Sequence, residues 1–324
     1  MVSQQPQTII ITGGNTGLGY ACAESIANAR PHDHIILACR NPIKASAAVQ
    51  TLKKRTGNLT IEALPLDLAS LSSVRAFVEE FSALTFPPLQ AIICNAGLQI
   101  VSGTTYTEDG YETTFAVNHL GHFLLVNLLL PLLSPPARIV FVSSGTHDPD
   151  QHTGLPAPHY RGARALAWPD RYPDPDEASE DTATIGRRRY ATSKLCNILC
   201  TYELARRLAA PTDTLHNSPA SPITVNAFDP GMMPGSGLAR DYDPLRRFAW
   251  NYVLPIFSRL NPQANSIHSS AQFLAQLVLD EQLTNITGKY FARDRPIRSS
   301  ATSYDQSIAT ELWETSAELV GITQ

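Results

Sequence analysis

Short apolar runs recur along the chain, and each is followed by a longer amphipathic stretch. The runs are apolar at consecutive positions, which is typical of strands buried on both faces of a parallel sheet. They predict strands at Thr8–Thr12, His34–Cys39, Leu59–Leu66, Leu89–Cys94, Ala137–Val142, Ile223–Phe228 and Gly288–Phe291. The intervening stretches predict helices at Leu18–Ala29, Lys44–Arg55, Leu68–Leu84, Tyr111–Leu133, Arg189–Ala209 and Ala264–Leu279.

The alternation of strands and helices predicts an α/β fold, in which helices cover both faces of a doubly wound parallel sheet of the Rossmann type. There is no internal repeat or Gly/Ser linker, so we expect a single domain over residues 1–324. Two stretches lack this periodicity. Residues 145–189 are rich in proline and charge and predict an inserted segment on the substrate side, and residues 232–262 predict a lid-like segment.

Composition and charge narrow the classes of function. The 324 residues are 43% hydrophobic and 17% charged, which excludes a disordered chain, and the net charge of −4 argues against a nucleic-acid partner. No uninterrupted run of about 18 apolar residues occurs, so we expect no stable membrane insertion. The five cysteines form no Cys-x-x-Cys pair and lie among apolar residues, which indicates buried thiols and a cytoplasmic protein. Whether the protein forms a homo-oligomer stays an open question at this point.

A glycine-rich turn follows the first predicted strand and opens the first predicted helix. Glycines let a phosphate approach the backbone closely, and a helix N-terminus offers unpaired N–H groups. Some βα turns of this kind bind no ligand, but the place after the first strand favours a dinucleotide site. The residues expected to bind the cofactor here are Thr12, Gly13, Asn15, Thr16, Gly17, Leu18 and Gly19.

The end of the second predicted strand indicates which nicotinamide cofactor is bound. A carboxylate at this place favours the free 2′-hydroxyl of NAD, whereas an arginine favours the 2′-phosphate of NADP. The strand is followed by Arg40, and Lys44 comes one helical turn later. We therefore expect NADP(H), with both cations near its phosphate. The alternative is that Arg40 is a solvated loop residue.

Tyr190 and Lys194 are spaced i, i+4 in a predicted helix and so lie on one face. A phenol has a pKa near 10, which is too high for acid–base work at neutral pH. An ammonium about 4 Å away stabilises a phenolate by roughly 4 kcal/mol at an effective dielectric near 20, enough to bring the pKa to about 7. By itself, this spacing more often marks a solvated helix face.

Ser143 and Ser144 follow the predicted strand Ala137–Val142, at the edge of the sheet where doubly wound folds bind ligands. A serine hydroxyl there can hydrogen-bond a substrate carbonyl and polarise it. The alternative is a turn or capping serine. Together with Tyr190 and Lys194, a serine at this place predicts chemistry at an oxygen-bearing carbon.

A series of short motifs occurs in a fixed order over about residues 8–235. They are Thr12-Gly13-x3-Gly17-x-Gly19, Asp67-Leu68, Asn95-Ala96-Gly97, Asn118, Val142-Ser143-Ser144, Tyr190-x3-Lys194 and Pro230-Gly231. Jointly they resemble the short-chain dehydrogenase/reductase family. Longer stretches, such as the one from Asn118 to Leu124, are similar to light-dependent protochlorophyllide reductases and to retinol-dehydrogenase-like members.

The resemblance implies a role for each matched residue. Tyr190 would be the general acid/base, and Lys194 would lower its pKa and bind the nicotinamide ribose. Ser144, rather than Ser143, would orient the substrate carbonyl, and Asn118 would hold a water in a proton relay to Lys194. The implied contacts to the rest of the cofactor are Asp67, Leu68, Asn95, Ala96, Gly97, Pro230 and Gly231, with Ser236 where many members carry a threonine.

The expected function is an NADP(H)-dependent oxidoreductase that moves a hydride between nicotinamide and the carbonyl or alcohol carbon of a small, lipophilic substrate. Two alternatives stay open: a C=C reductase of the protochlorophyllide reductase type, and a non-catalytic NADP(H)-sensing or scaffold protein. Ser144 and Tyr190 lie farther apart in the chain than in compact members of the family.

Three weaker signals have a structural explanation beside a functional one. His119 and His122 are spaced i, i+3, but packing on a helix explains them better than a metal, so no metal is expected. The run 187–189 consists of three arginines that either face solvent or steer an anionic substrate. The aromatic residues among 248–257 indicate core or part of a substrate lid.

Overall fold

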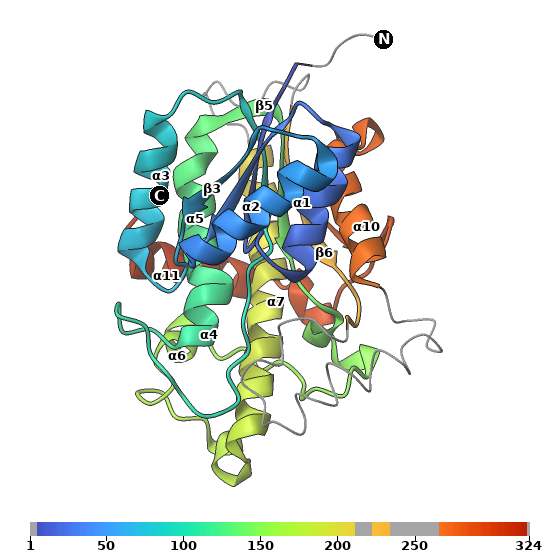
Figure 1. The fold of residues 1–324 in the computed structure, drawn as a ribbon. Coiled ribbons are helices and arrows are strands. Elements are labelled where there is room, and N and C mark those ends of the chain that lie inside the picture. The colour runs from blue at the N-terminus through green and yellow to red at the C-terminus, as the bar shows by residue number, and fades with distance from the viewer. Residues whose placement is uncertain (1–4, 211–221, 234–265, 323–324) are drawn as a thin grey trace.

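An eight-stranded sheet forms the centre of the computed structural model, which describes residues 5–210, 222–233 and 266–322 (Figure 1). Its strands are β1 (Thr8–Thr12), β2 (His34–Cys39), β3 (Ile61–Pro65), β4 (Leu89–Cys94), β5 (Leu133–Val142), β6 (Ile223–Asp229), β7 (Lys289–Ala292) and β8 (Arg295–Ile297). The order in the sheet is β3-β2-β1-β4-β5-β6-β7-β8. Strands β1 to β7 pair in parallel, and only β8 at the edge is antiparallel. The predicted α/β, doubly wound fold is confirmed.

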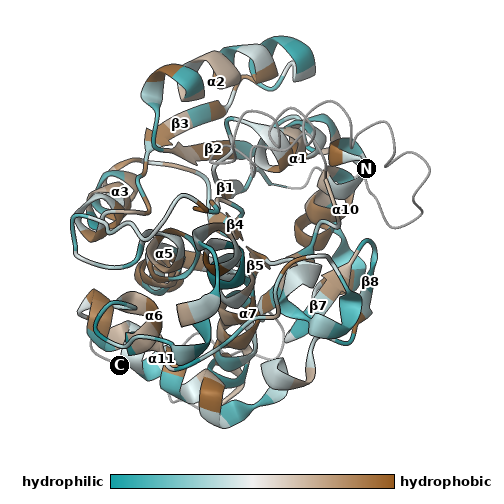
Figure 2. Ribbon diagram, turned by 90° about the horizontal axis from the view of Figure 1, so that it is seen from below, coloured by the Kyte–Doolittle hydropathy of each residue, from teal (hydrophilic) through white to brown (hydrophobic). Residues whose placement is uncertain are grey.

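Helices cover both faces of this sheet, as Figure 2 shows from the edge where the strands end. One face is covered by α1 (Gly17–Ala29), α2 (Pro42–Thr56) and α10 (Ile267–Leu279). The other is covered by α3 (Leu71–Ala83), α5 (Gly121–Leu129) and α7 (Thr182–Ala209), with α11 (Gln306–Val320) packed outside α7. Strands β1 and β2 are buried at every residue, because both of their faces meet helices.

The strand order reverses between β1 and β4, since β2 and β3 lie on one side of β1 and the later strands on the other. The carboxyl ends of parallel strands at such a switch point form the usual ligand crevice of doubly wound folds. The turn from β1 into α1 and the residues after β4, β5 and β6 all lie at this edge. The fold therefore gathers the predicted motifs at one end of the sheet.

The predicted helix over 111–133 is one helical segment with changing geometry. It begins as α4 (Thr113–Phe115), widens into a π-helical turn at Ala116–Leu120, continues as α5 and ends in a 3-10 turn at Leu130–Leu132. The whole segment Thr113–Leu132 is long and apolar enough to cross a membrane by length and composition alone. Because 72% of its most apolar window is buried inside the protein, it is a core helix of this fold.

Helix α7 begins at Thr182, seven residues before the predicted start. Asp181 caps it, since its Oδ1 accepts a hydrogen bond of 2.7 Å from the backbone N–H of Thr184. The predicted inserted segment 145–189 therefore includes the first two turns of this helix, which extend below the sheet in Figure 1. It also contains short helical turns at Gly145–His147, Pro149–Gln151 and Pro175–Ser179, and the helix α6 (Ala163–Ala167).

Three parts of the prediction need correction or lie beyond the described residues. β5 begins four residues early, because Leu133 pairs with Leu89 before the ladder is interrupted and resumes opposite Arg138. The pattern-based prediction contained neither β8 nor α11. Ser236, the aromatic residues among 248–257 and nearly all of 232–262 lie outside the described residues. The single domain over 1–324 stays a prediction.

Candidate active site

The glycine-rich turn after β1 is shaped for a phosphate. Gly13 and Gly17 have φ values of 65° and 58°, a region that L side chains rarely adopt. A Cβ on Gly19 would lie 2.5 Å from Asn95 Nδ2 and 2.8 Å from the Gly13 oxygen, so glycine is needed for this close packing. In contrast, a Cβ on Gly17 would have no described atom within 4 Å, apart from those of its own turn. Thr16 precedes α1 without capping it, which leaves the first N–H groups for an anion.

The hydroxyl of Thr12 joins the ends of β1 and β4. Its Oγ1 accepts hydrogen bonds of 2.9 Å from the backbone N–H groups of Asn95 and Ala96, and lies 2.8 Å from Nε2 of His122. Asn95 returns a bond of 2.8 Å from Nδ2 to the backbone oxygen of Thr12. Since Thr12 is fully buried, its observed role is to hold the turn in place. A direct contact of these residues with a cofactor stays a prediction, as it does for Asn15 and Leu18.

Arg40 and Lys44 lie where β2 ends and α2 begins, and both are exposed. Asn41 caps α2 by accepting a hydrogen bond of 2.9 Å from the backbone N–H of Lys44. Among the described residues, neither cationic side chain has a recorded hydrogen bond or ion pair. Both therefore remain available for a phosphate on the same edge as the glycine turn.

Hydrogen bonds of Asp67 stabilise the loop after β3. Its Oδ1 accepts a hydrogen bond of 3.0 Å from the N–H of Ala69, and its own N–H donates to Ser73 Oγ at 2.9 Å. Leu68 is buried, and a Cβ on Gly121 would lie 2.5 Å from its backbone oxygen. This close approach explains a glycine inside the core helix. The predicted adenine contacts of Asp67 and Leu68 stay untested.

Asn118 lies in the π-helical turn and holds the chain that follows β4. Its Oδ1 accepts from the N–H of Leu98 at 2.8 Å, while Nδ2 donates to the Leu98 oxygen and to Ser193 Oγ, both at 2.9 Å. A Cβ on Gly97 would lie 3.4 Å from both Asn118 Oδ1 and Lys194 Nζ. Gly97, Asn118 and Lys194 therefore meet at one point, and π-helical turns of this kind often occur at functional sites. The water relay implied for Asn118 stays a prediction.

Tyr190 and Lys194 come from one face of α7 and are both buried. Lys194 Nζ lies 5.5 Å from the centre of the Tyr190 ring and donates a hydrogen bond of 3.1 Å to the oxygen of Val142. Burial lowers the pKa of Lys194 to about 8, and the carboxylate of Asp229 opposes that shift. A lysine with this pKa is still largely protonated at neutral pH, in contact with the phenol ring.

The side chains of Ser143 and Ser144 point in opposite directions, because successive side chains of an extended chain alternate. They therefore have different contacts. Ser143 Oγ is buried and donates a hydrogen bond of 2.8 Å to the backbone oxygen of Lys194, so it fastens β5 to α7. Ser144 is partly exposed, and its Oγ accepts from the N–H of Thr146 at 3.3 Å. Its hydroxyl proton is free to turn toward a substrate, in keeping with the choice of Ser144 over Ser143.

Asp229 belongs to the site but was absent from the predicted residues. It ends β6, and its Oδ1 accepts from the N–H of Gly231 at 2.8 Å, while Oδ2 accepts from the hydroxyl of Tyr290 at 2.8 Å. Its charge acts on Lys194 across the end of β5. A carboxylate at the end of an apolar strand, directly before Pro230 and Gly231, was the sequence signal for it.

The paired histidines of the core helix have separate hydrogen-bond partners. His119 Nε2 lies 2.9 Å from Ser316 Oγ of α11, and His122 bonds to Thr12 of β1. Burial lowers the pKa of His119 to about 3 and that of His122 to about 4, so both rings are neutral at physiological pH. These contacts agree with the packing interpretation of the pair.

Comparisons with known proteins agree with this arrangement. The family model described as short chain dehydrogenase matches residues 7–153. A WW domain-containing oxidoreductase of Gallus gallus is 36% identical over 97% of this chain and 68% of its own length. The chain belongs to the short-chain dehydrogenase family. The predicted family, the oxidoreductase class and a nicotinamide cofactor are thereby confirmed at the level of the family.

Other members are similar over nearly the whole chain. A chloroplastic protochlorophyllide reductase A of Oryza sativa subsp. japonica is 33% identical over 97% of this chain and 80% of its own. A polyprenol dehydrogenase of Danio rerio is 33% identical over 98% of this chain and 88% of its own. Among solved structures, an uncharacterised protein from Mycobacterium Paratuberculosis matches with a TM-score of 0.66 and 26% identity, covering 99% of this chain and 97% of that one.

Proposed function

We propose that this dehydrogenase is an NADP(H)-dependent enzyme that reduces a carbonyl compound, or oxidises the matching alcohol, with Tyr190 as general acid/base. The observation that supports it best is the convergence of Lys194, Asn118 and Gly97 beside Tyr190, next to a glycine turn with uncapped N–H groups. Exposed Arg40 and Lys44 at the end of β2 support a 2′-phosphate on the cofactor. Five buried, free cysteines support a reducing, cytoplasmic location.

Tyr190, Lys194 and Ser144 have different roles in the proposed reaction. NADPH, when bound, supplies the hydride that reaches the carbonyl carbon. Tyr190 donates its hydroxyl proton to the carbonyl oxygen, and the nearby Lys194 ammonium stabilises the phenolate that is left. Ser144 donates a hydrogen bond to the same oxygen and polarises it. Burial of Tyr190 and Lys194 keeps water away and strengthens the interaction between them.

Changing Tyr190 to Phe tests the proposal directly. It removes the proton donor but not the ring, so kcat should fall about 10²–10⁴-fold while NADPH binding persists. Tyr202→Phe on the same helix is the control, because Tyr202 bonds to Ser299 and should leave kcat almost unchanged. Turnover of a panel of ketones, aldehydes and alcohols is followed by NADPH absorbance, with NADH in parallel. Full activity of Tyr190→Phe would contradict the mechanism, and equal rates with NADH would contradict the role of Arg40.

The similarity to a protochlorophyllide reductase supports a second candidate, reduction of a C=C bond in a large planar substrate. Tyr190 would then protonate the carbon that does not receive the hydride. Assays with the pigment in light and in darkness test it, and the absence of light-dependent turnover would reject it. Cofactor binding without turnover of any compound in either series would favour a sensing or scaffold role.

A further inference from the structure

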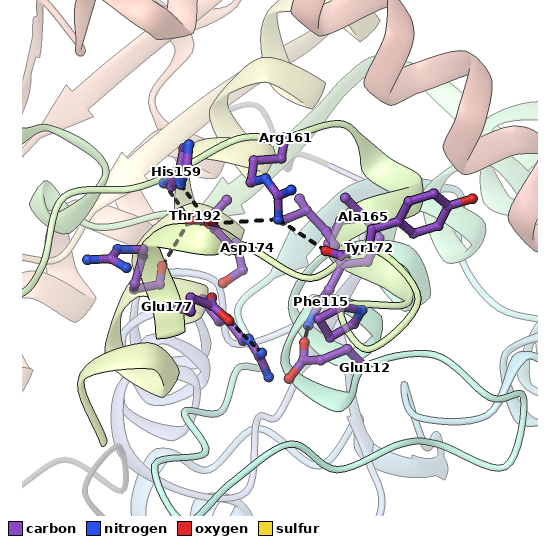
Figure 3. Close-up of a pocket in the computed structure, with 14 residues that line it drawn as sticks. Glu112, Phe115, His159, Arg161, Ala165, Tyr172, Asp174, Glu177 and Thr192 are labelled. Carbon is purple, nitrogen blue, oxygen red and sulfur yellow. Dashed lines mark hydrogen bonds and ion pairs between the residues drawn. The ribbon is translucent and has the colours of Figure 1, made fainter. Parts of the chain in front are cut away.

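The three consecutive arginines at the start of α7 have different surroundings. Arg188 forms a two-fold hydrogen-bonded ion pair with Glu180, through Nη1 and Nη2. Arg189 pairs with Glu177 at 3.1 Å and donates to Thr104 Oγ1 at 2.7 Å. Both line the pocket drawn in Figure 3. At 3.6 residues per turn, they lie on the side of α7 away from Lys194. Their charges are therefore already compensated by the protein.

Arg187 lies on the other side of the helix. It precedes Tyr190 by three residues and Lys194 by seven, a spacing that places all three on one helix face. Its Nε donates to the backbone oxygen of Ala183 at 3.0 Å, and its Nη2 lies 3.5 Å from Thr184 Oγ1. Both acceptors are neutral, and no ion pair of Arg187 is recorded among the described residues. Nη1 likewise has no recorded partner there.

A second pocket opens beside this arginine. Its walls come from residues 146–157 and from the first turns of α7, and they include Thr146, Asp148, His152, Thr184 and Arg187. Thr146 connects it with the active site, because its N–H donates to Ser144 Oγ. The Oγ1 of Thr146 is buried and has no hydrogen-bond partner among the described residues. The pocket thus holds a cation without an ion pair and a hydroxyl without a partner among the described residues, and Thr146 links it to Ser144.

Two carboxylates lie near Arg187, and each accepts a hydrogen bond from the backbone. Asp148 also lines this pocket, but its Oδ1 accepts from the N–H of Asp150 at 3.1 Å. Asp181, whose charge Arg187 also feels, caps α7 through the N–H of Thr184. A guanidinium has five N–H donors and pairs best with two-oxygen anions. A ligand with such an anion would satisfy donors that the described part of the protein leaves unused.

We infer that the substrate carries an oxyanion, a carboxylate or a phosphate, which Arg187 binds while Tyr190 and Ser144 engage its carbonyl group. The inference rests on the proposed function, since it concerns the substrate of that same site. Side chains three residues apart on a helix have Cβ atoms about 5–6 Å apart, so one substrate can contact both Arg187 and Tyr190. The substrate class is therefore that of oxo acids, hydroxy acids or phosphorylated carbonyl compounds.

Matched pairs of compounds test this inference. The probes are short oxo acids with their methyl esters, and dihydroxyacetone phosphate with dihydroxyacetone. For wild type, kcat/KM should favour the anionic member of at least one pair, and that pair shows whether the anion is carboxylate or phosphate. Arg187→Gln should reduce this preference about 10- to 100-fold, as expected for a charge-assisted hydrogen bond. Arg188→Gln, on the paired side of α7, is the matched control and should keep the preference.

A binding measurement separates this inference from the proposed function. Tyr190→Phe protein saturated with NADPH is titrated calorimetrically with the same acids and phosphates, with and without Arg187→Gln. Weaker binding of the anions after loss of Arg187, but not of Arg188, supports the inference even if no compound is turned over. Equal affinity of anionic and neutral members, or an equal effect of Arg187→Gln on both, would overturn it while leaving the role of Tyr190 intact.

Discussion

The two sides of α7 use charge in different ways, although one short stretch of sequence supplies both. On the side of Tyr190, Lys194 is buried with a pKa lowered to about 8, and Arg187 has no recorded ion pair in the described part of the chain. On the other side, Arg188 and Arg189 are matched by carboxylates from the segment just before the helix. Perturbed or unpaired charges cluster at functional sites, so the side of Tyr190 is the candidate functional surface.

The segment 145–181 likewise has two parts with different surroundings. Its first part, up to residue 157, lines the pocket beside Ser144. Its later part packs into the protein: Ala163 and Ala167 are fully buried, and the hydroxyl of Tyr160 and the N–H of Ala163 both bond to Glu311 of α11. The first part therefore lies on the side of Ser144, while the later part packs against α11 and lines the pocket of Figure 3. The substrate-side role of the segment stays a prediction.

The largest effect is expected from Lys194→Met on the catalytic side. Loss of the ammonium removes the charge that stabilises the Tyr190 phenolate, so kcat should fall about 10²–10⁴-fold. Thr192→Val on the opposite side should cost about 1 kcal/mol of unfolding free energy with little change in kcat, because Thr192 Oγ1 bonds to backbone atoms of His159 and Arg188. Steady-state kinetics and urea unfolding measure the two quantities. A large kcat loss in Thr192→Val would break the contrast between the two sides.

A smaller effect is expected from exchanging residues 152–157 for a short Gly/Ser turn. This alters the wall of the pocket beside Arg187, so kcat/KM for the substrate should change about 10- to 100-fold with little change in NADPH affinity. Ala167→Leu in the later part should instead cost about 1–3 kcal/mol of stability by overpacking a fully buried position. Kinetics, cofactor titration and thermal melting distinguish them. An equal loss of substrate turnover and cofactor affinity in the exchange would refute this assignment.

The smallest effect concerns pH. Lys194 loses its proton as the pH rises through about 8, so kcat for reduction should fall on that basic limb. The Asp229 carboxylate favours the charged lysine, and Asp229→Asn should therefore move the limb to lower pH by roughly 1 unit. Tyr290→Phe is the control, because it keeps the carboxylate and removes only the hydrogen bond to it. His122 is already neutral there, since its pKa is about 4. An unmoved limb would show that Lys194 does not set it.

Much of the fold could be predicted because local pattern and tertiary structure agree. The apolar runs became β1, β2 and β4 at the predicted residues, since a buried parallel strand needs apolar side chains on both faces. The start of α7 was missed, because residues 182–189 are polar on nearly all sides and show no apolar stripe. Their helix depends on the Asp181 cap and on packing of Gly186, where a Cβ would lie 2.0 Å from the Ile100 oxygen.

The sequence alone determined, through the spacing of residues along a helix or turn, which residues could act together. Tyr190 and Lys194 share a face because a helix has 3.6 residues per turn, and the turn before α1 carries glycines because they adopt its positive φ values without strain. Tertiary structure alone decided what each charge meets. It set Arg188 and Arg189 against carboxylates, left Arg187 beside an open pocket, and set Asp229 of β6 near Lys194 of α7. These encounters depend on how the loop before α7 folds back and on which strands lie next to the helix, and the apolar pattern does not show them.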